Sequence, residues 1–336
     1  MISPCMVMTF FMLPKQFLAY NGNDKNHYYM YNYIDLLIVD EAGQISPEVA
    51  APSFSLAKKA VVVGDEEQIP PVWGTTRALD IAMAISNKVI DGKEQYCELE
   101  INGLNCSQSS IMKLASLSCA FDKYKKGLFL CEHRRCYNEI VTYCNKLVYE
   151  DKLEPKRGSV VEDKNNALSG LLPAMGHKQI TVSRSQKSGS SRQNKEEAKQ
   201  ILAWLKANYE AIVDCYRKKG KNSINEKELI GVITPFKSQS ILIKKLIKEE
   251  FPDYAQFIDV GTVHTFQGAE RKIILFSSVY GNEDGRYFIN RAPNLMNVAV
   301  SRAKDSFLVF GDCGCLSGGE KTAAGLLKNM TKTIVK

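Results

Sequence analysis

Two short clusters of acidic residues could hold a divalent cation beside a phosphate group. Asp40 and Glu41 follow the apolar run at residues 36–39, and a second cluster at residues 65–68 (Asp-Glu-Glu-Gln) follows the run at residues 60–63. Paired carboxylates suit Mg²⁺, a hard cation that is usually held by one or two carboxylates together with substrate phosphates. A single cluster would be explained more simply as a cap on the next helix. Two clusters in tandem favour a cation site.

The elements that must position these acids are two neighbouring strands. Continuous apolar and β-branched runs of about four residues suit strands that are buried on both faces of a parallel α/β sheet. Ligands bind such sheets beyond the carboxyl ends of the strands. We therefore expect both acidic clusters at that edge of the sheet.

The second half of the chain alternates between strand-like and helix-like patterns, which predicts a second parallel α/β domain. Asn194 with Glu197 forms a capping-box-like start to a long amphipathic helix, whereas residues 150–195 read as irregular. The predicted strands are residues 229–233, 257–263, 272–279 and 306–310, with a short strand from residue 127 into the arginines at 134 and 135. The other predicted helices are residues 76–87, 109–121, 138–148, 238–250 and 294–304.

Composition sets the broad class of protein. A chain of 336 residues suggests about two domains, and 45% hydrophobic with 24% charged residues is ordinary for a soluble protein. A net charge of +7 allows a nucleic-acid partner without requiring one. The ten cysteines are scattered without a CxxC pair, which favours reduced thiols in a cytoplasmic protein over a zinc site. No apolar run of about 20 residues is present, so we expect no membrane partner.

The two acidic clusters also resemble motifs II and III of superfamily 1 helicases, in the branch that holds the nonsense-mediated-decay RNA helicase and its DNA-processing relatives. Asp40-Glu41-Ala-Gly-Gln is similar to the Walker B box, and Gly-Asp-x-x-Gln68-x-Pro-Pro is similar to motif III. The resemblance implies that Asp40 and Glu41 contact Mg²⁺. It also implies that Glu41 orients or activates the attacking water, and that Gln68 senses the γ-phosphate.

Three later stretches resemble motifs IV, V and VI of the same family. Residues 132–135 (Glu-His-Arg-Arg) stand where the family has Tyr-Arg-Met in motif IV, so Arg134 is the matching arginine and Arg135 stays a rival. Residues 261–270 match motif V and residues 297–304 match motif VI. The resemblance implies that Arg134 and Arg302 stabilise charge on the γ-phosphate, as arginines from a facing domain do.

The motif V stretch carries residues for two kinds of contact. The resemblance implies that Glu270 contacts the nucleotide ribose and that Gly268 belongs to the nucleotide-binding set. Thr262, His264 and Thr265 lie at the end of a predicted strand, where hydroxyls and backbone amides could grip nucleic-acid phosphates. Taken singly, His264 would more often be a satisfied core residue, and Arg302 would more often form a surface ion pair.

One part of the helicase pattern is missing. ATPases of this class use a Gly-x-x-x-x-Gly-Lys-Ser/Thr loop to cradle phosphates, and the chain contains none. The nearest match runs from Gly314 to Thr322, but Glu320 is an extra residue and the stretch follows motif VI.

The resemblance as a whole implies an α/β fold with two RecA-like, parallel-sheet P-loop NTPase domains. Residues 1–126 would form an incomplete first domain and residues 127–336 a second.

The expected function is that of the C-terminal part of an ATP-dependent DNA or RNA helicase or translocase, with ATP and Mg²⁺ between the domains. Its expected partners are single-stranded DNA or RNA and an upstream polypeptide that supplies the missing loop, without which the chain would be inactive. One alternative is a catalytically inactive nucleic-acid-binding or scaffold module, and another is an ATPase that does not unwind. The retained Asp40, Glu41, Gln68, Arg134 and Arg302 argue against a long-standing loss of activity.

Overall fold

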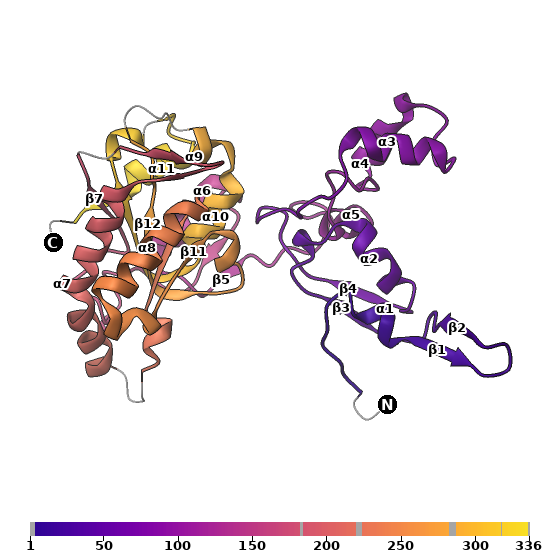
Figure 1. The fold of residues 1–336 in the computed structure, drawn as a ribbon, viewed down its shortest axis with the longest axis horizontal. Helices are drawn as coiled ribbons and strands as arrows, with labels where there is room; N and C mark the ends of the chain where they lie inside the picture. The colour runs from indigo at the N-terminus through magenta and orange to yellow at the C-terminus, as the bar shows by residue number, and fades with distance from the viewer. Residues whose placement is uncertain (1–3, 182–183, 220–223, 282–286, 317, 335–336) are drawn as a thin grey trace. The chain divides into compact units, whose positions relative to one another are not determined.

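The computed structural model describes residues 4–181, 184–219, 224–281, 287–316 and 318–334 (Figure 1). The fold is α/β, and the chain divides into two compact units, Met1–Phe129 and Leu130–Lys336. Each unit has hydrophobic core clusters of its own. Among the described residues, no helix is both long and apolar enough to cross a membrane.

The second unit is built on a six-stranded sheet in which every pair of neighbours is parallel. Its spatial order is β11-β10-β12-β13-β7-β14. The strands are β7 (Met175–Gln179), β10 (Ile230–Thr234), β11 (Ile258–Thr262), β12 (Arg271–Ser277), β13 (Ala303–Gly311) and β14 (Lys332–Thr333). The four strands predicted in the second half are confirmed, and β7 and β14 are additions.

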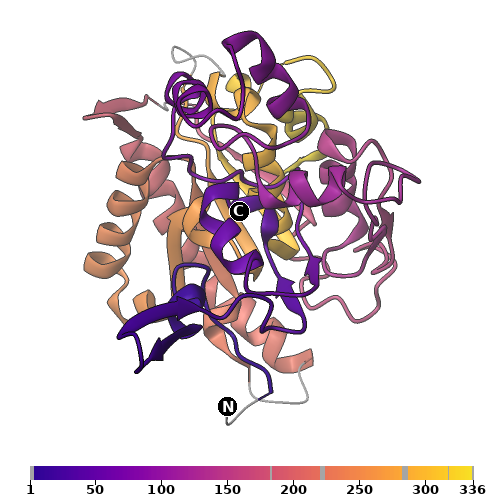
Figure 2. The same cartoon turned by 90° about the vertical axis from the view of Figure 1, so that its right-hand side faces the viewer.

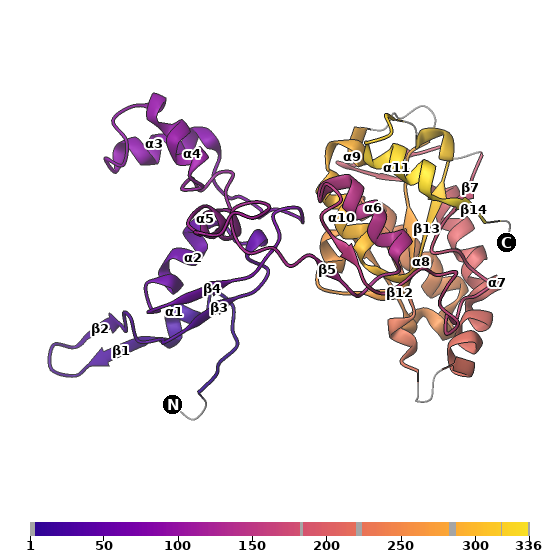
Figure 3. The same ribbon diagram turned by 180° about the vertical axis from the view of Figure 1, so that it is seen from behind.

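Helices cover both faces of this sheet (Figures 1 and 3). α7 (Lys195–Lys219) and α8 (Lys237–Glu250) pack on one face, and α6 (Asn138–Val148), α10 (Pro293–Ser301) and α11 (Ala323–Met330) lie on the other. Figure 2 shows the orange α8 and the magenta α6 on opposite sides of the strands. The predicted helix at residues 138–148 is therefore confirmed. The predicted strand from residue 127 is wrong except for β5 (Glu132–His133).

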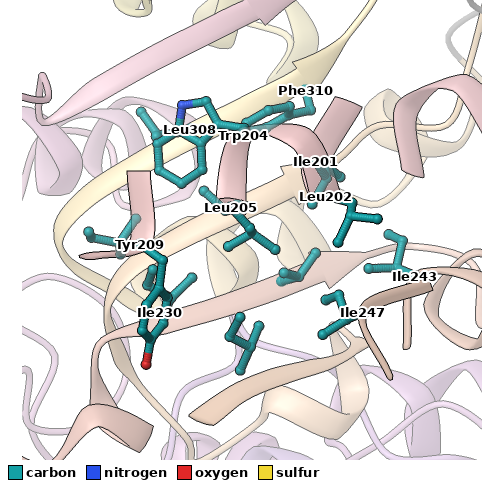
Figure 4. Packing of buried hydrophobic residues seen from close by; sticks show 14 of the residues in the cluster. Ile201, Leu202, Trp204, Leu205, Tyr209, Ile230, Ile243, Ile247, Leu308 and Phe310 are labelled. Carbon is teal, nitrogen blue, oxygen red and sulfur yellow. The ribbon is translucent and has the colours of Figure 1, made fainter. Parts of the chain in front are cut away.

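Successive residues of a central strand face different helices, which explains its continuous apolar sequence. Leu308 and Phe310 of β13 join the cluster formed by α7 and α8 (Figure 4). There Trp204 meets Phe310 edge to face, with ring centroids 5.8 Å apart. On the other face, Phe307 stacks on Phe276 of β12 at 5.7 Å. All of these rings are buried, so both faces of the sheet contribute to the core.

A buried carboxylate ties the start of α7 to the end of β12. Asn194 caps the helix as predicted, because its Oδ1 accepts a hydrogen bond from the backbone N of Glu197 at 3.1 Å. The Glu197 carboxylate does not close a capping box. It accepts hydrogen bonds from Ser277 Oγ at 2.6 Å, Ser278 Oγ at 3.2 Å and the backbone N of Val279 at 2.8 Å. Glu197 thus joins two elements that are far apart in the sequence.

The first unit has a much smaller sheet. β3 (Leu37–Val39) and β4 (Ala60–Val62) pair in parallel, as predicted, with Ile38 opposite Val61. α2 (Pro47–Phe54) and α5 (Ile111–Leu117) contribute to the cluster that buries Val39. The expectation that both faces are buried is wrong, because Ile38 is 67% exposed and Val61 is 48% exposed. A sheet of two strands is covered here on one face only.

The remaining elements of this unit are short. α1 (Leu13–Gln16) precedes an antiparallel hairpin of β1 (Leu18–Asn21) and β2 (Asn26–Tyr29). α3 (Arg77–Ser86) confirms the helix predicted at residues 76–87, although its apolar face is not covered and it buries no residue. α4 (Tyr96–Ile101) follows it.

We expect the substitution Glu197→Ala to lower the free energy of unfolding of the second unit by about 3 kcal/mol, because three buried donors lose their acceptor. Glu197→Gln keeps one acceptor oxygen and should lose less. The midpoint of urea unfolding, followed through the buried Trp204, measures both. Glu249→Ala on the exposed face of α8 is the control, and an equal loss in that variant would contradict the assigned role.

Candidate functional site

The carboxyl ends of β3 and β4 are held together by backbone packing. The backbone N of Ala42 donates to the carbonyl O of Val63 at 3.0 Å. A Cβ on Gly64 would lie 2.8 Å from the backbone N of Ala42, and a Cβ on Gly43 would overlap the carbonyl oxygen of Asp65. Only glycine fits at either position. The Asp-Glu-Ala-Gly and Gly-Asp segments therefore lie directly against each other at one edge of the sheet.

Asp40 and Glu41 stand exposed at this edge, immediately after β3. Glu41 has a left-handed backbone, with φ of 54°. Such a conformation costs on the order of 1 kcal/mol in a non-glycine residue and is enriched at active sites and ligand-binding segments. Asp40 Oδ1 accepts the backbone N of Glu41 at 2.8 Å, and Gln44 Nε2 donates to Glu41 Oε2 at 2.7 Å. These contacts hold both carboxylates at the end of the strand.

The second cluster is organised around Asp65. Its Oδ1 accepts the backbone N of Glu67 at 2.9 Å, and its Oδ2 accepts Gln68 Nε2 at 3.3 Å. No group of three or more His, Cys, Asp or Glu side chains forms a ready metal cage among the described residues. Mg²⁺ usually needs only one or two carboxylates beside the phosphates of a substrate. The exposed oxygens of Asp40 and Glu41 fit that requirement.

In the second unit, a cluster of charges surrounds Glu270 at the amino end of the sheet. Glu270 directly precedes β12, and Lys304 lies at the start of β13. Arg135 Nε is 2.8 Å from Glu270 Oε2, and Lys304 Nζ contacts Glu270 Oε1. Partial burial raises the pKa of Glu270, but the hydrogen bond from Lys304 and the charge of Arg135 outweigh it, so the pKa lies below its usual value. Glu270 is therefore a carboxylate at neutral pH.

Arg302 lies beside this cluster at the end of α10. Only 5% of the residue is exposed, so the surface ion pair considered for it is not what the structure contains. Its Nε donates to the carbonyl O of Val298 at 3.2 Å and its Nη2 to Ser301 Oγ at 3.3 Å. Its positive charge also helps to lower the pKa of Glu270. The guanidinium is thus held in place by its own helix.

The two arginines of the motif IV-like stretch differ in their surroundings. Arg134 is exposed, and its Nη2 pairs with Glu132 Oε2 at 2.7 Å. Arg135, the rival from the sequence, is the one that reaches Glu270. The pattern comparison gave no role to Lys304, although it stands two residues after Arg302. A second positive charge two residues after a motif arginine is the sequence signal that could have identified Lys304.

Two titratable groups behind this cluster are uncharged. Burial, and then the charge of Arg135, lower the pKa of His133 below its usual value. Burial raises the pKa of the Cys136 thiol to about 12. The Cys136 Sγ lies 3.9 Å from His133 Nε2 and 3.7 Å from the carbonyl O of Ser301. The chemistry available here is therefore that of fixed cations and one carboxylate.

The motif V-like stretch turns at the opposite edge of the sheet. Thr262 ends β11, and residues 264–266 form a 3₁₀ turn in which Thr265 Oγ1 donates to the carbonyl O of Thr262 at 2.8 Å. His264 and Thr265 are exposed, so His264 is not a core residue. Phe266 is buried against Gly261, where a Cβ would lie 3.1 Å from its ring. That ring anchors the turn that presents the polar residues.

Gly268 and the near match to a phosphate loop have simple structural settings. Gly268 adopts φ of 77°, which favours glycine, and a Cβ there would meet open space. Thr322 caps α11, with its Oγ1 accepting the backbone N of Gly325 at 3.2 Å. The stretch around Gly319 is therefore accounted for by a helix cap.

Comparison with known proteins gives a consistent result. The model of the AAA_12 family, described as an AAA domain, matches residues 108–314. The DNA replication ATP-dependent helicase/nuclease DNA2 of Xenopus laevis is 27% identical over 291 residues, covering 82% of this chain and 25% of that protein. The probable helicase MAGATAMA 3 of Arabidopsis thaliana is 26% identical over 290 residues, covering 84% and 31%.

Helicase sen1 of Schizosaccharomyces pombe is 25% identical over 300 residues, covering 88% of this chain and 15% of that protein. The chain thus spans less than a third of the length of each of these relatives. Because the family model matches more than half of the chain, the chain belongs to the AAA_12 family of AAA domains, and it corresponds to the C-terminal region of a superfamily 1 helicase.

Proposed function

We propose that the chain is the C-terminal part of an ATP-dependent DNA or RNA helicase or translocase, in which residues of two RecA-like domains act on one ATP. The observation that supports this most directly is the backbone packing of Gly43 and Gly64. It sets the acids after β3 beside the Asp65 to Gln68 turn after β4. Adjacent strand ends with paired carboxylates suit the positioning and charge neutralisation that phosphoryl transfer needs.

The proposed roles in the first unit follow from what each side chain offers. Asp40 and Glu41 would hold Mg²⁺, which when bound neutralises charge on the phosphate oxygens. A Glu41 oxygen accepts a hydrogen bond from the attacking water and so orients it. Gln68, held by Asp65, presents its amide toward the γ-phosphate.

In the second unit the proposal assigns fixed charges. Arg302, with Arg134 or Arg135, stabilises the negative charge that builds up on the γ-phosphate. Glu270, kept ionised by Lys304 and Arg135, accepts hydrogen bonds from ribose hydroxyls near Gly268. The scattered cysteines, among which the described residues contain no disulfide, support a cytoplasmic location for the protein.

The second candidate is a nucleic-acid-binding or scaffold module without turnover. It is favoured by the absence of a Gly-x-x-x-x-Gly-Lys loop from these 336 residues. The retained polar contacts of Glu41 and Gln68 favour the catalytic proposal instead. A nucleotide-hydrolysis assay of the longer protein separates the two.

Glu41→Gln, in a protein that includes the phosphate-binding loop, should leave ATP binding largely intact and suppress turnover. The neutral amide is a weaker hydrogen-bond acceptor than the carboxylate, so it should orient the attacking water less well. Arg302→Gln should lower turnover by a large factor, with roughly 10³-fold as a guide from arginine fingers. Steady-state phosphate release measures turnover, and a fluorescent ATP analogue measures binding.

The control for these variants is Glu249→Gln on the exposed face of α8, which pairs with none of the residues that the proposal assigns to ATP and should change turnover little. Because Arg302 is buried, its variant must also unfold at the wild-type urea concentration. Near-normal turnover in either Glu41→Gln or a folded Arg302→Gln would remove that residue from its role.

The 336-residue chain alone should hydrolyse ATP negligibly and associate in solution. The β- and γ-phosphates would lack the lysine and amide cradle, and the Ile38 and Val61 face leaves apolar area open to another chain. Ile38→Lys should reduce association measured by light scattering, whereas Ile241→Lys on α8 should not. Robust Mg²⁺-dependent hydrolysis by the purified chain would contradict the proposal.

Binding of single-stranded nucleic acid should involve mainly backbone phosphates near Thr262 and Thr265. Bound phosphates release counterions, so affinity should fall steeply between about 50 and 200 mM salt. Fluorescence anisotropy with labelled oligothymidylate and oligouridylate measures this for DNA and RNA. Affinity that does not change over this salt range would count against the proposed contact.

A further inference from the structure

A stretch of the second unit carries positive charge without any acid. From Lys164 to Lys195 the sequence contains six Lys or Arg residues and no Asp or Glu, although the whole chain has 44 basic and 37 acidic residues. This stretch contains the hairpin of β8 (Gln186–Ser188) and β9 (Ser191–Gln193). Three of the six cations, Arg184, Lys187 and Arg192, lie in this hairpin or just before it.

The hairpin directs its cations to one face. Lys187 and Arg192 are direct cross-strand partners, and side chains of such partners share a face of the ribbon. Arg192 Nε donates to Ser185 Oγ at 3.0 Å, which draws the segment containing Arg184 to the same place. The two-residue turn begins with Gly189 at φ of 60°, a conformation typical of tight hairpins. The ribbon is thus a defined structure with clustered basic side chains.

Contacts with α8 fix where this hairpin lies. The backbone N of Ser238 donates to Ser191 Oγ at 3.2 Å, and the backbone N of Asn194 donates to Gln239 Oε1 at 2.7 Å. The first residue of α8, Lys237, is exposed and adds another cation beside the hairpin. Figure 2 shows the rose hairpin next to the first turn of the orange α8.

This basic surface lies on the same edge of the sheet as the motif V-like turn. β10 runs directly into α8, and its last residue Thr234 pairs with Thr262 at the end of β11. Within the part of the chain that the structure describes, Arg184, Lys187 and Lys237 form no ion pair with a carboxylate. With no acid paired to them among the described residues, these three exposed cations carry a charge that is complementary to a polyanion.

We propose that Arg184, Lys187 and Lys237 bind phosphodiester groups of a single-stranded nucleic acid, as a continuation of the surface around Thr262. The inference rests on the proposed function, and it names the residues that extend the contact along the strand. Guanidinium and ammonium groups both suit phosphates, and contacts to phosphates carry no base preference. The site should therefore strengthen binding to DNA and RNA without adding sequence specificity.

The test uses the full 336-residue chain and two double variants that remove the same charge. Lys187→Gln with Lys237→Gln changes the proposed site. Lys244→Gln with Lys248→Gln changes exposed lysines further along α8. Anisotropy titrations with labelled oligothymidylate and oligouridylate at about 50, 100 and 200 mM salt give the slope of log affinity against log salt.

Each lost phosphate contact should reduce the magnitude of that slope by about 0.7, so the site variant should lose about 1.4. Over a fourfold change in salt, a difference of about 1.4 makes the affinity deficit about sevenfold larger at low salt than at high salt. The control variant should keep the wild-type slope. Both variants should unfold at the wild-type urea concentration, because all four lysines are exposed.

The possible outcomes separate this inference from the proposed function. If wild-type protein binds neither oligonucleotide, the proposed function fails. If wild type binds and the site variant keeps its slope, or the control loses as much, only the hairpin proposal is overturned. Polyglutamate is the last arm: if it competes as well as the oligonucleotides at equal charge, an acidic polypeptide is the partner and the proposal is wrong.

Discussion

A parallel sheet needs apolar cover on both faces, and that constraint governs how each unit of this chain is built. In the second unit, alternate residues of β13 serve two layers, with Phe310 against Trp204 and Phe307 against Phe276. This core fixes the positions of the amino and carboxyl ends of the strands. In the first unit, Val39 is covered while Ile38 is exposed, so the same strand pattern leaves an open apolar face.

The rigid sheet of the second unit keeps two kinds of chemistry at opposite edges. At the amino end, Glu270 with Arg135 and Lys304 forms a compact set of opposed charges next to the buried Arg302. At the carboxyl end, Thr262 and Lys237 stand among exposed polar groups. A cluster of paired charges suits a compact ligand such as a nucleotide, whereas a row of separate cations suits an extended polyanion.

Regular elements could be predicted where burial dictated the residue pattern. β10 could be predicted because both of its faces are covered and its sequence is therefore apolar. The start of α7 could be predicted because Asn194 caps the helix. β7 escaped prediction because His177 and Lys178 interrupt its apolar pattern. In the structure β7 lies between β13 and the short β14. The exposure of Ile38 was also hidden, because sequence patterns report what a strand can bury and not what covers it.

The candidate site residues divide in the same way, into those that a local sequence pattern predicts and those that depend on a contact between distant segments. The position of Asp40 and Glu41 at a strand end could be predicted because they directly follow an apolar run, whereas Gln68, six residues after β4, was singled out through the resemblance to motif III. The contact of Arg135 with Glu270 could not be predicted, since that required knowing that the segment before α6 meets the start of β12. That contact joins residues far apart in the chain, and no local pattern encodes it.

The polar network around Glu197 connects the sheet of the second unit to the hairpin and to the first turn of α8. It joins the cap of α7 to the end of β12, where Val279 is held at φ of 71°, an unusual conformation for a β-branched residue. Gln239 extends the network, because its Nε2 donates to Ser277 Oγ at 3.0 Å and its Oε1 accepts the backbone N of Asn194. The base of the hairpin and the first turn of α8 are therefore fixed to one buried carboxylate. The exposed side chains of Arg184, Lys187 and Lys237 extend from this fixed base, and flexible cations on a fixed base suit the proposed contact with a phosphate backbone.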